Sequence, residues 1–125
     1  MPAPGGDRPR PTPAPATAVI ERLEPEELRD LLANGGRVRL IDVREEEEWR
    51  ICRLPGAELL PLSRFAEWAP DFEPGPGRCV LYCHHGVRSL RAAAALAAQG
   101  VEGLADLRGG IEAWRQRVDP SLPAY

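Results

Sequence analysis

The 125-residue sequence contains no lysine, so all 16 basic residues are arginine, and the formal net charge is −3. We attribute the missing lysine to codon usage rather than to function. A net-acidic chain argues against nucleic acid or an anionic membrane as a partner. The sequence also lacks an apolar run near the ~20 residues of a membrane span, and it shows no signal peptide. The expected location is therefore the cytoplasm.

Cysteine and histidine are scarce. Three cysteines in a chain without a secretion signal indicate free thiols rather than a disulfide framework. The only two histidines, His84 and His85, are adjacent and have no second Cys/His cluster to complete a ligand set, so we expect no metal site. We assign Cys79 to the core. Cys52 is interpreted as a structural cysteine, with resolution of an oxidised Cys83 as the alternative.

Two regions differ in composition. Residues 1–17 are rich in proline, alanine and arginine, and we predict a disordered or polyproline-like tail there. Residues 18–125 are long enough for one domain. Within them, short apolar runs alternate with helix-forming runs, which predicts an α/β domain around a mostly parallel sheet. The expected strands are 18–23, 38–43, 57–62, 79–83 and 104–107, and the expected helices are 25–33, 45–52, 63–68, 89–99 and 111–117.

The most informative segment is Cys-His-His-Gly-Val-Arg at residues 83–88, between a predicted strand and a predicted helix. The N–H groups of such a loop and of the first helical turn lack carbonyl partners, so they can converge on an anion. A thiolate is favoured over a thiol there, which makes Cys83 a candidate nucleophile; the alternative is a buried small hydrophobe. Gly86 permits the unusual backbone angles that the loop needs. Arg88 can donate to an anion or to a loop carbonyl.

A second strand end carries polar side chains. Because ligands of parallel α/β sheets bind beyond the carboxyl ends of the strands, Asp42 and Arg44 are expected on the same edge as Cys83. The four consecutive glutamates at 45–48 are interpreted as a solvated helix face. The three tryptophans are interpreted as packing residues.

These motifs resemble the rhodanese family of sulfurtransferases. The matching segments follow the family order across residues 18–117: Leu40-Ile-Asp-Val-Arg44, Leu54-Pro-Gly-Ala57, Tyr82 to Ser89, and Leu107 to Trp114. Residues 118–125 also look like the ends of small stand-alone members. One departure is Cys52-Arg53, where many members carry Gly-His. The resemblance implies a rhodanese-like fold, with a central five-stranded, mostly parallel sheet flanked by helices on both faces.

The resemblance also implies a reaction. Cys83 would take a sulfane sulfur from a small donor such as thiosulfate or a low-molecular-weight persulfide. It would then pass the sulfur from its persulfide to cyanide, a thiol or a sulfur-acceptor protein, without a cofactor. The residues that would cradle the persulfide are His84, His85, Gly86, Val87 and Arg88, and Asp42, Arg44 and Ser89 would support them.

Two alternatives stay open. One is a catalytically silent rhodanese-fold binding module; such modules usually lack the cysteine or have a disrupted loop, and this chain keeps both. The other is a phosphatase or arsenate reductase of similar fold, in which five residues separate cysteine from arginine. Only four intervene here, and the shorter ring of amides suits one sulfur atom better than a tetrahedral oxyanion. Nothing in the sequence requires more than a monomer.

Overall fold

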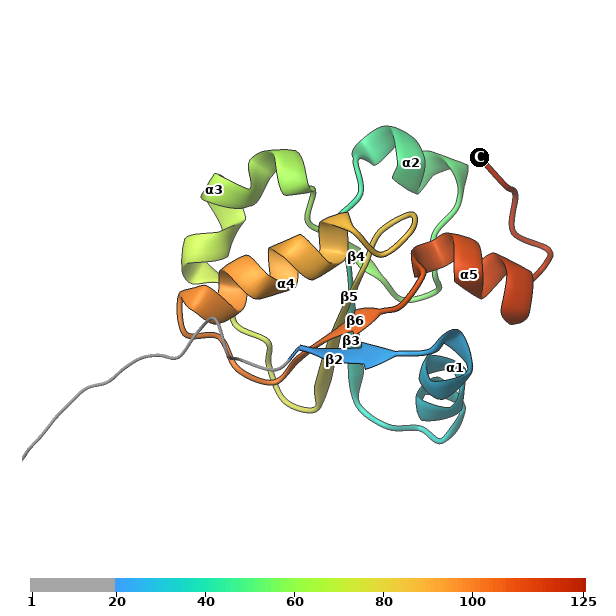
Figure 1. Cartoon of the computed structure of the whole chain (residues 1–125), viewed down its shortest axis with the longest axis horizontal. Helices are drawn as coiled ribbons and strands as arrows, with labels where there is room; N and C mark the ends of the chain where they lie inside the picture. Colours follow the sequence, from blue (N-terminus) through green and yellow to red (C-terminus); the bar gives the residue numbers. More distant parts are fainter. Residues whose placement is uncertain (1–19) are drawn as a thin grey trace, which may run out of the picture.

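The computed structural model describes residues 20–125 (Figure 1). The predicted tail at 1–17 and the first two residues of the first predicted strand lie outside the described residues. Five strands form one sheet in the spatial order β2-β6-β5-β3-β4, and each neighbouring pair is parallel. The strands are β2 (Glu21–Leu23), β3 (Val38–Asp42), β4 (Glu58–Leu59), β5 (Arg78–Tyr82) and β6 (Leu104–Leu107). The predicted α/β architecture is confirmed.

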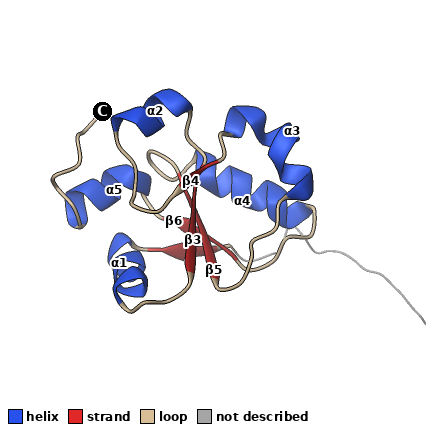
Figure 2. Cartoon of the chain, turned by 180° about the vertical axis from the view of Figure 1, so that it is seen from behind, coloured by secondary structure: helices blue, strands red, loops and turns tan. Residues whose placement is uncertain are grey.

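Helices cover both faces of the sheet. They are α1 (Pro25–Ala33), α2 (Glu46–Ile51), α3 (Phe65–Trp68), α4 (Arg88–Ala98) and α5 (Gly110–Arg117), and the short 3-10 turns η2 (Leu62–Arg64) and η3 (Ala69–Asp71) flank α3. Helices α1 and α5 pack on one face and α3 and α4 on the other, while α2 lies near the carboxyl edge (Figures 1 and 2). No helix formed by residues 20–125 combines the length and the apolar character that crossing a membrane requires.

Local sequence explains where helix α1 begins. Pro25 occupies the first helical turn, where its missing N–H costs nothing and its fixed φ suits the helix. The N–H of Glu24 donates to the Glu27 carboxylate at 2.8 Å, completing a capping box. Leu28 faces the core and is fully buried. The predicted helix over 25–33 is confirmed to the residue, and the signals that set its start lie within one turn of chain.

Strand β4 is shorter than the predicted run over 57–62. Leu60 and Leu62 still donate their N–H groups to the carbonyls of Asp42 and Val43, at 2.9 and 3.0 Å. Between them, Pro61 has no N–H to continue a ladder, and the chain turns into η2 directly afterwards. The prediction was therefore too long at its carboxyl end.

The alternation of side chains along the strands divides the core in two. Leu40, Val80 and Tyr82 pack with the α1 and α5 layer, and Ile41 and Cys83 pack with the α3 and α4 layer. Strands β3 and β5 are paired so that Asp42 lies opposite Tyr82. The residues that follow these two strands therefore start from the same edge of the sheet.

Candidate active site

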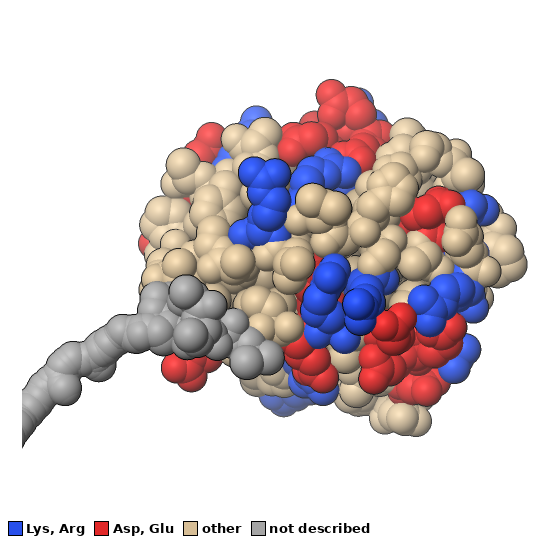
Figure 3. Space-filling view, viewed as in Figure 1, with Lys and Arg blue, Asp and Glu red and all other residues tan. Residues whose placement is uncertain are grey.

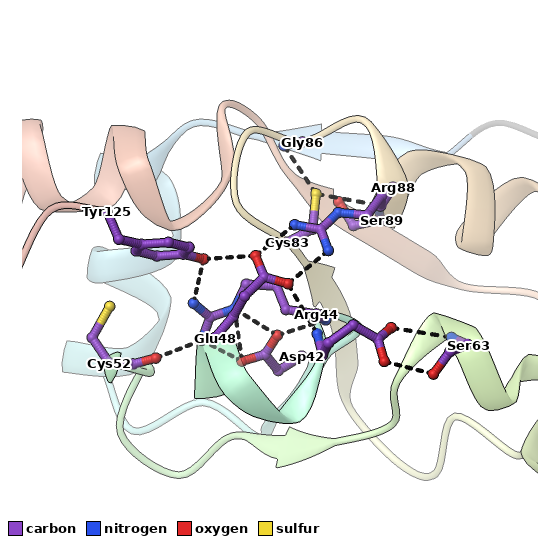
Figure 4. A network of polar contacts seen from close by, with 11 residues as sticks. Asp42, Arg44, Glu48, Cys52, Ser63, Cys83, Gly86, Arg88, Ser89 and Tyr125 are labelled. Atoms are coloured by element: carbon purple, nitrogen blue, oxygen red, sulfur yellow. Dashed lines mark hydrogen bonds and ion pairs between the residues drawn. The ribbon is translucent and has the colours of Figure 1, made fainter. Parts of the chain in front are cut away.

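The Cys83 loop joins the end of β5 to the start of α4 and bends around its own sulfur. The sulfur of Cys83 accepts hydrogen bonds from the N–H groups of Gly86 at 3.1 Å and Ser89 at 3.3 Å (Figure 4). The side chain is 1% exposed, as a buried hydrophobe would be, but a hydrophobe needs no such donors. Two N–H dipoles aimed at one sulfur favour negative charge on it.

Gly86 occupies a position that no other residue fits well. Its φ is +93°, in the region that residues with a Cβ rarely adopt. A Cβ built there would lie 2.9 Å from the backbone nitrogen of Gly109. Gly86 thus has the unusual backbone angles expected of it, and the backbone of Gly109 also approaches it closely.

The start of α5 forms the back of the loop. The N–H groups of Ile111 and Glu112 donate to the carbonyls of Cys83 and His84, at 2.9 and 3.0 Å. Gly110 makes this contact possible, because a Cβ there would lie 2.6 Å from the Cys83 carbonyl oxygen. The loop thus rests backbone to backbone on a helix that follows it by more than twenty residues.

Asp106 anchors both residues that donate to the sulfur. This buried side chain on β6 accepts a hydrogen bond from the Ser89 hydroxyl and two from Arg22, at 3.0 and 3.1 Å. Arg22 also donates to the Gly86 carbonyl at 3.3 Å. Burial raises the pKa of Asp106, and the hydrogen bonds from Ser89 and Arg22 oppose that shift. Asp106 was not among the site residues predicted from the sequence, although a carboxylate inside the apolar run Leu104–Leu107 is a recognisable signal.

Asp42 and Arg44 form a buried ion pair at the end of β3. Both side chains are fully buried, and the shortest contact between the guanidinium and the carboxylate is 2.7 Å. Arg44 also donates to the Cys52 carbonyl at 2.5 Å and to the Tyr125 hydroxyl at 2.6 Å. The pair therefore holds the segments around α2 and the end of the chain in place.

The two other cysteines are buried apart from the loop. The Cys52 thiol contacts the Pro123 carbonyl at 3.7 Å, and Figure 4 shows it on the other side of Arg44 from Cys83. Cys79 lies in the core, as predicted, and burial raises the pKa of its thiol to about 11. In the part of the chain that the structure describes, neither thiol accepts from backbone N–H groups as Cys83 does.

Arg88, the last residue of the loop motif, is held by Glu48 of α2. Its guanidinium makes two contacts with the Glu48 carboxylate, at 2.7 and 2.8 Å, and donates to no loop carbonyl. The interpretation of residues 45–48 as a solvated face is therefore wrong for Glu48, and also for Glu45, which binds Ser63. No local signal in the sequence identifies Glu48 among four glutamates, because its partner lies 40 residues away.

The histidines of the loop form part of an aromatic stack. The ring of His84 lies between those of His85 and Tyr125, with centroids 3.9 Å away on either side. Its Nε2 atom is buried and has no hydrogen-bond partner among residues 20–125. Burial lowers the pKa of His84, and the neighbouring His85 lowers it further, so the neutral form is favoured. The tip of the loop, Val87, is 62% exposed.

The charges around the site are largely paired. Figure 3 shows arginine and carboxylate side chains adjoining one another over the face that it displays. Arg22 is paired with Asp106 and Arg88 with Glu48. Within residues 20–125, no group of three or more His, Cys, Asp or Glu side chains is placed to hold a metal ion.

Comparison with known proteins identifies the family. A family model described as a rhodanese-like domain matches residues 24–117. The chain belongs to this family. It is 39% identical over 104 residues to the probable adenylyltransferase/sulfurtransferase MoeZ of Mycobacterium tuberculosis, covering 82% of this chain. It is 37% identical over 113 residues to the rhodanese-like/PpiC domain-containing protein 12, chloroplastic, of Arabidopsis thaliana, covering 85% of this chain.

The rhodanese-like chain spans only part of these relatives, 26% of MoeZ and 38% of the plant protein. Among solved structures it is similar to the human single-domain sulfurtransferase TSTD1, with a TM-score of 0.67, 30% identity, and coverage of 79% of this chain and 98% of that one. A rhodanese-like domain protein from Staphylococcus aureus gives a TM-score of 0.70 at 26% identity, with coverage of 85% of this chain and 99% of that one. The domain is thus homologous to sulfurtransferase domains.

Proposed function

We propose that this rhodanese-like domain is a sulfurtransferase in which Cys83 carries a sulfane sulfur as a persulfide. The observation that carries the proposal is the pair of N–H groups, from Gly86 and Ser89, directed at the Cys83 sulfur. Donors that favour a thiolate also suit the negative outer sulfur of a persulfide, since they are in place before charge develops. Homology to sulfurtransferase domains supports this chemistry.

The reaction has two displacement steps. The Cys83 thiolate attacks the outer sulfur of thiosulfate, an S–S bond forms on Cys83, and the S–S bond of thiosulfate breaks with its electron pair leaving on sulfite. An acceptor nucleophile, cyanide or a thiolate, then attacks the outer sulfur of the persulfide. The electron pair of that S–S bond returns to Cys83 as thiolate. Neither step requires a cofactor.

Several features favour this function over the alternatives. The loop keeps its cysteine, its glycine and its N–H donors, which a silent binding module does not need. Only four residues lie between Cys83 and Arg88, and such a short ring of backbone amides suits one sulfur atom better than a tetrahedral oxyanion. The Arg88 guanidinium is paired with Glu48, which leaves it less available to bind a phosphate or arsenate group. We propose a small sulfane donor, because Cys83 is 1% exposed. As acceptor we propose a thiol or a protein of the sulfur-carrier type, because the chain is similar to part of an adenylyltransferase/sulfurtransferase.

Intact mass spectrometry tests this function. We expect thiosulfate or glutathione persulfide to add ~32 Da to the protein and cyanide or dithiothreitol to remove it. Cys83→Ser should abolish the mass gain, while the control Cys52→Ser should keep it. A folded wild-type protein that gains sulfur from neither donor would refute the proposal. Turnover of p-nitrophenyl phosphate or arsenate would instead support the phosphatase or reductase alternative.

A further inference from the structure

Tyr125 contacts one end of the Cys83 loop directly and is linked to the other end through Glu48. Its ring lies on the ring of His84, with centroids 3.9 Å apart and an interplanar angle of 8°. Its hydroxyl lies 3.1 Å from the Glu48 carboxylate, the group that holds Arg88 (Figure 4). One side chain thus reaches His84 directly and Arg88 through a single intermediate.

The hydrogen bonds of the Tyr125 hydroxyl have a fixed direction. Arg44 lies 2.6 Å from the phenol oxygen, and a guanidinium can only donate. The oxygen therefore accepts from Arg44, and the phenol proton is left to donate to Glu48. Because Arg44 is fully buried in its ion pair with Asp42, the hydroxyl is attached to a rigid part of the sheet edge.

The segment that carries Tyr125 is itself anchored. Val118 and Leu122 pack against the core formed by α1 and α5. The N–H of Asp119 donates to the Trp114 carbonyl at 2.9 Å. These contacts place Tyr125 beside the loop without help from the loop itself.

We propose that Tyr125 is a positioning residue for the reaction at Cys83: it holds His84 and, through Glu48, Arg88, and so keeps the loop closed around the sulfur. The catalytic part of this inference rests on the proposed sulfurtransferase function; the closure of the loop does not. The ring of Tyr125 covers one side of the His84 ring, and His85 stacks on it as well. The charges that act on His84 are those of His85, Glu48, Glu112 and Arg44. Removing the ring should expose both the Cys83 sulfur and the His84 ring.

The test compares wild type with Tyr125→Ala, Tyr125→Phe and the control Leu32→Ala. Leu32 is matched in exposure, 36% against 39% for Tyr125, but lies on α1. Iodoacetamide labelling, quantified for each cysteine by peptide mass spectrometry, reports access to the sulfur. We expect Tyr125→Ala to speed alkylation of Cys83 about five-fold or more, as loosening a local contact would, while Cys79 stays unreactive. Leu32→Ala should behave as wild type.

Tyr125→Phe separates the two contacts and keeps the test valid if the alanine variant unfolds. It retains the ring on His84 and loses the hydroxyl on Glu48, so we expect a rate of Cys83 alkylation between those of wild type and Tyr125→Ala.

By NMR titration, the pKa of His84 should stay below its ordinary 6.5 in the phenylalanine variant and rise toward it in the alanine variant. In assays with thiosulfate, we expect both Tyr125 variants to show a rise in KM that is larger than the fall in kcat, each relative to wild type. The reason is that a looser loop binds the donor less tightly.

Two outcomes distinguish this inference from the proposed function. If Cys83 alkylation and the His84 titration are the same in wild type and both Tyr125 variants, the inference is wrong whatever the activity. If both change as expected but no variant, wild type included, takes sulfur from thiosulfate, Tyr125 closes the loop and the sulfurtransferase function is wrong.

Discussion

At the scale of single residues, the N–H groups that hold the Cys83 sulfur depend on a carboxylate that the sequence motif does not contain. Asp106 binds Ser89 directly and Gly86 through Arg22. The two carboxylate oxygens of Asp106 accept three hydrogen bonds, one from the Ser89 hydroxyl and two from the Arg22 guanidinium. An amide of the same shape has one acceptor oxygen and no charge. It would lose the charge-assisted hydrogen bonds with Arg22, or keep weaker ones only if the Ser89 hydroxyl turns round to accept from the amide N–H.

We predict that Asp106→Asn lowers the free energy of unfolding by about 1–3 kcal/mol, because buried hydrogen bonds to a charged group are replaced by weaker ones to a neutral amide. It should also slow the loading of Cys83 by thiosulfate, because Gly86 and Ser89 lose their anchor. Urea unfolding and the time course of the mass gain measure the two effects.

Asp30→Asn is the control for this prediction. Asp30 pairs with Arg29 at the surface, where its side chain is 64% exposed, and such pairs contribute roughly 0–1 kcal/mol. Equal unfolding free energies and equal loading rates for the two variants would show that Asp106 does not support the loop.

At the scale of elements, the loop and the start of α5 form one unit. The run Gly109-Gly110 looks in the sequence like a turn before the last helix. In the structure it lets two helical N–H groups bond the carbonyls of Cys83 and His84. The glycines are thus required by a contact with the loop as well as by the turn itself.

We predict that Gly110→Ala both destabilises the fold and opens the loop. Gly110 has a φ of +66°, and its added methyl group would lie 2.6 Å from the Cys83 carbonyl oxygen. Gly35→Ala is the matched control, since Gly35 has a φ of +71° but nothing within 4 Å of the added carbon. The control should cost about 1–2 kcal/mol of backbone strain and leave sulfur loading unchanged.

Urea unfolding and thiosulfate loading separate the two glycine variants. Gly110→Ala should lose more unfolding free energy than Gly35→Ala and should load sulfur more slowly while still folded. Normal loading by the Gly110 variant would contradict a structural link between α5 and the loop.

At the scale of the whole molecule, Glu48 connects three distant parts of the chain. It lies on α2, binds Arg88 at the start of α4, and accepts from Tyr125 at the end of the described chain. The hydrogen bonds from Arg88 lower the pKa of Glu48 from 4.5 to about 2. A carboxyl whose pKa is lower in the folded state stabilises the fold above its unfolded pKa and loses that effect as the pH falls.

We therefore predict that the stability contributed by Glu48 is complete above about pH 5 and disappears as the pH falls toward about 2. Glu48→Gln should lower the unfolding free energy at neutral pH by about 1–2 kcal/mol, after allowance for partial exposure of the pair. Near the acid limit the variant and wild type should converge. Urea unfolding over a pH series measures this.

Glu46→Gln serves as the control for the pH series. Glu46 and Arg50 form a pair whose side chains are 63% and 70% exposed, so this substitution should change stability little at any pH. If the difference in unfolding free energy between wild type and Glu48→Gln stays constant from neutral to acid pH, the role given to Glu48 is contradicted.

The sequence by itself determined the succession of strands and helices along the chain, the α/β class and the Cys83 loop. These features follow from signals that lie close together along the chain: capping residues and Pro25 at the start of α1, apolar runs for the strands, and glycine inside a short loop. It also placed Asp42 and Arg44 at the edge that carries Cys83, because carboxyl ends of neighbouring parallel strands meet there.

Only the tertiary structure decided which side chains hold the loop. Glu48 and Arg88 are 40 residues apart, Arg22 and Gly86 are 64 apart, and Glu48 and Tyr125 are 77 apart. Local propensity contains no information on such distant pairs, and in the case of Glu48 it does not distinguish among four consecutive glutamates. The spatial order of the strands and the packing of the helices bring these residues within hydrogen-bond distance, so the choice of partners is made by the fold as a whole.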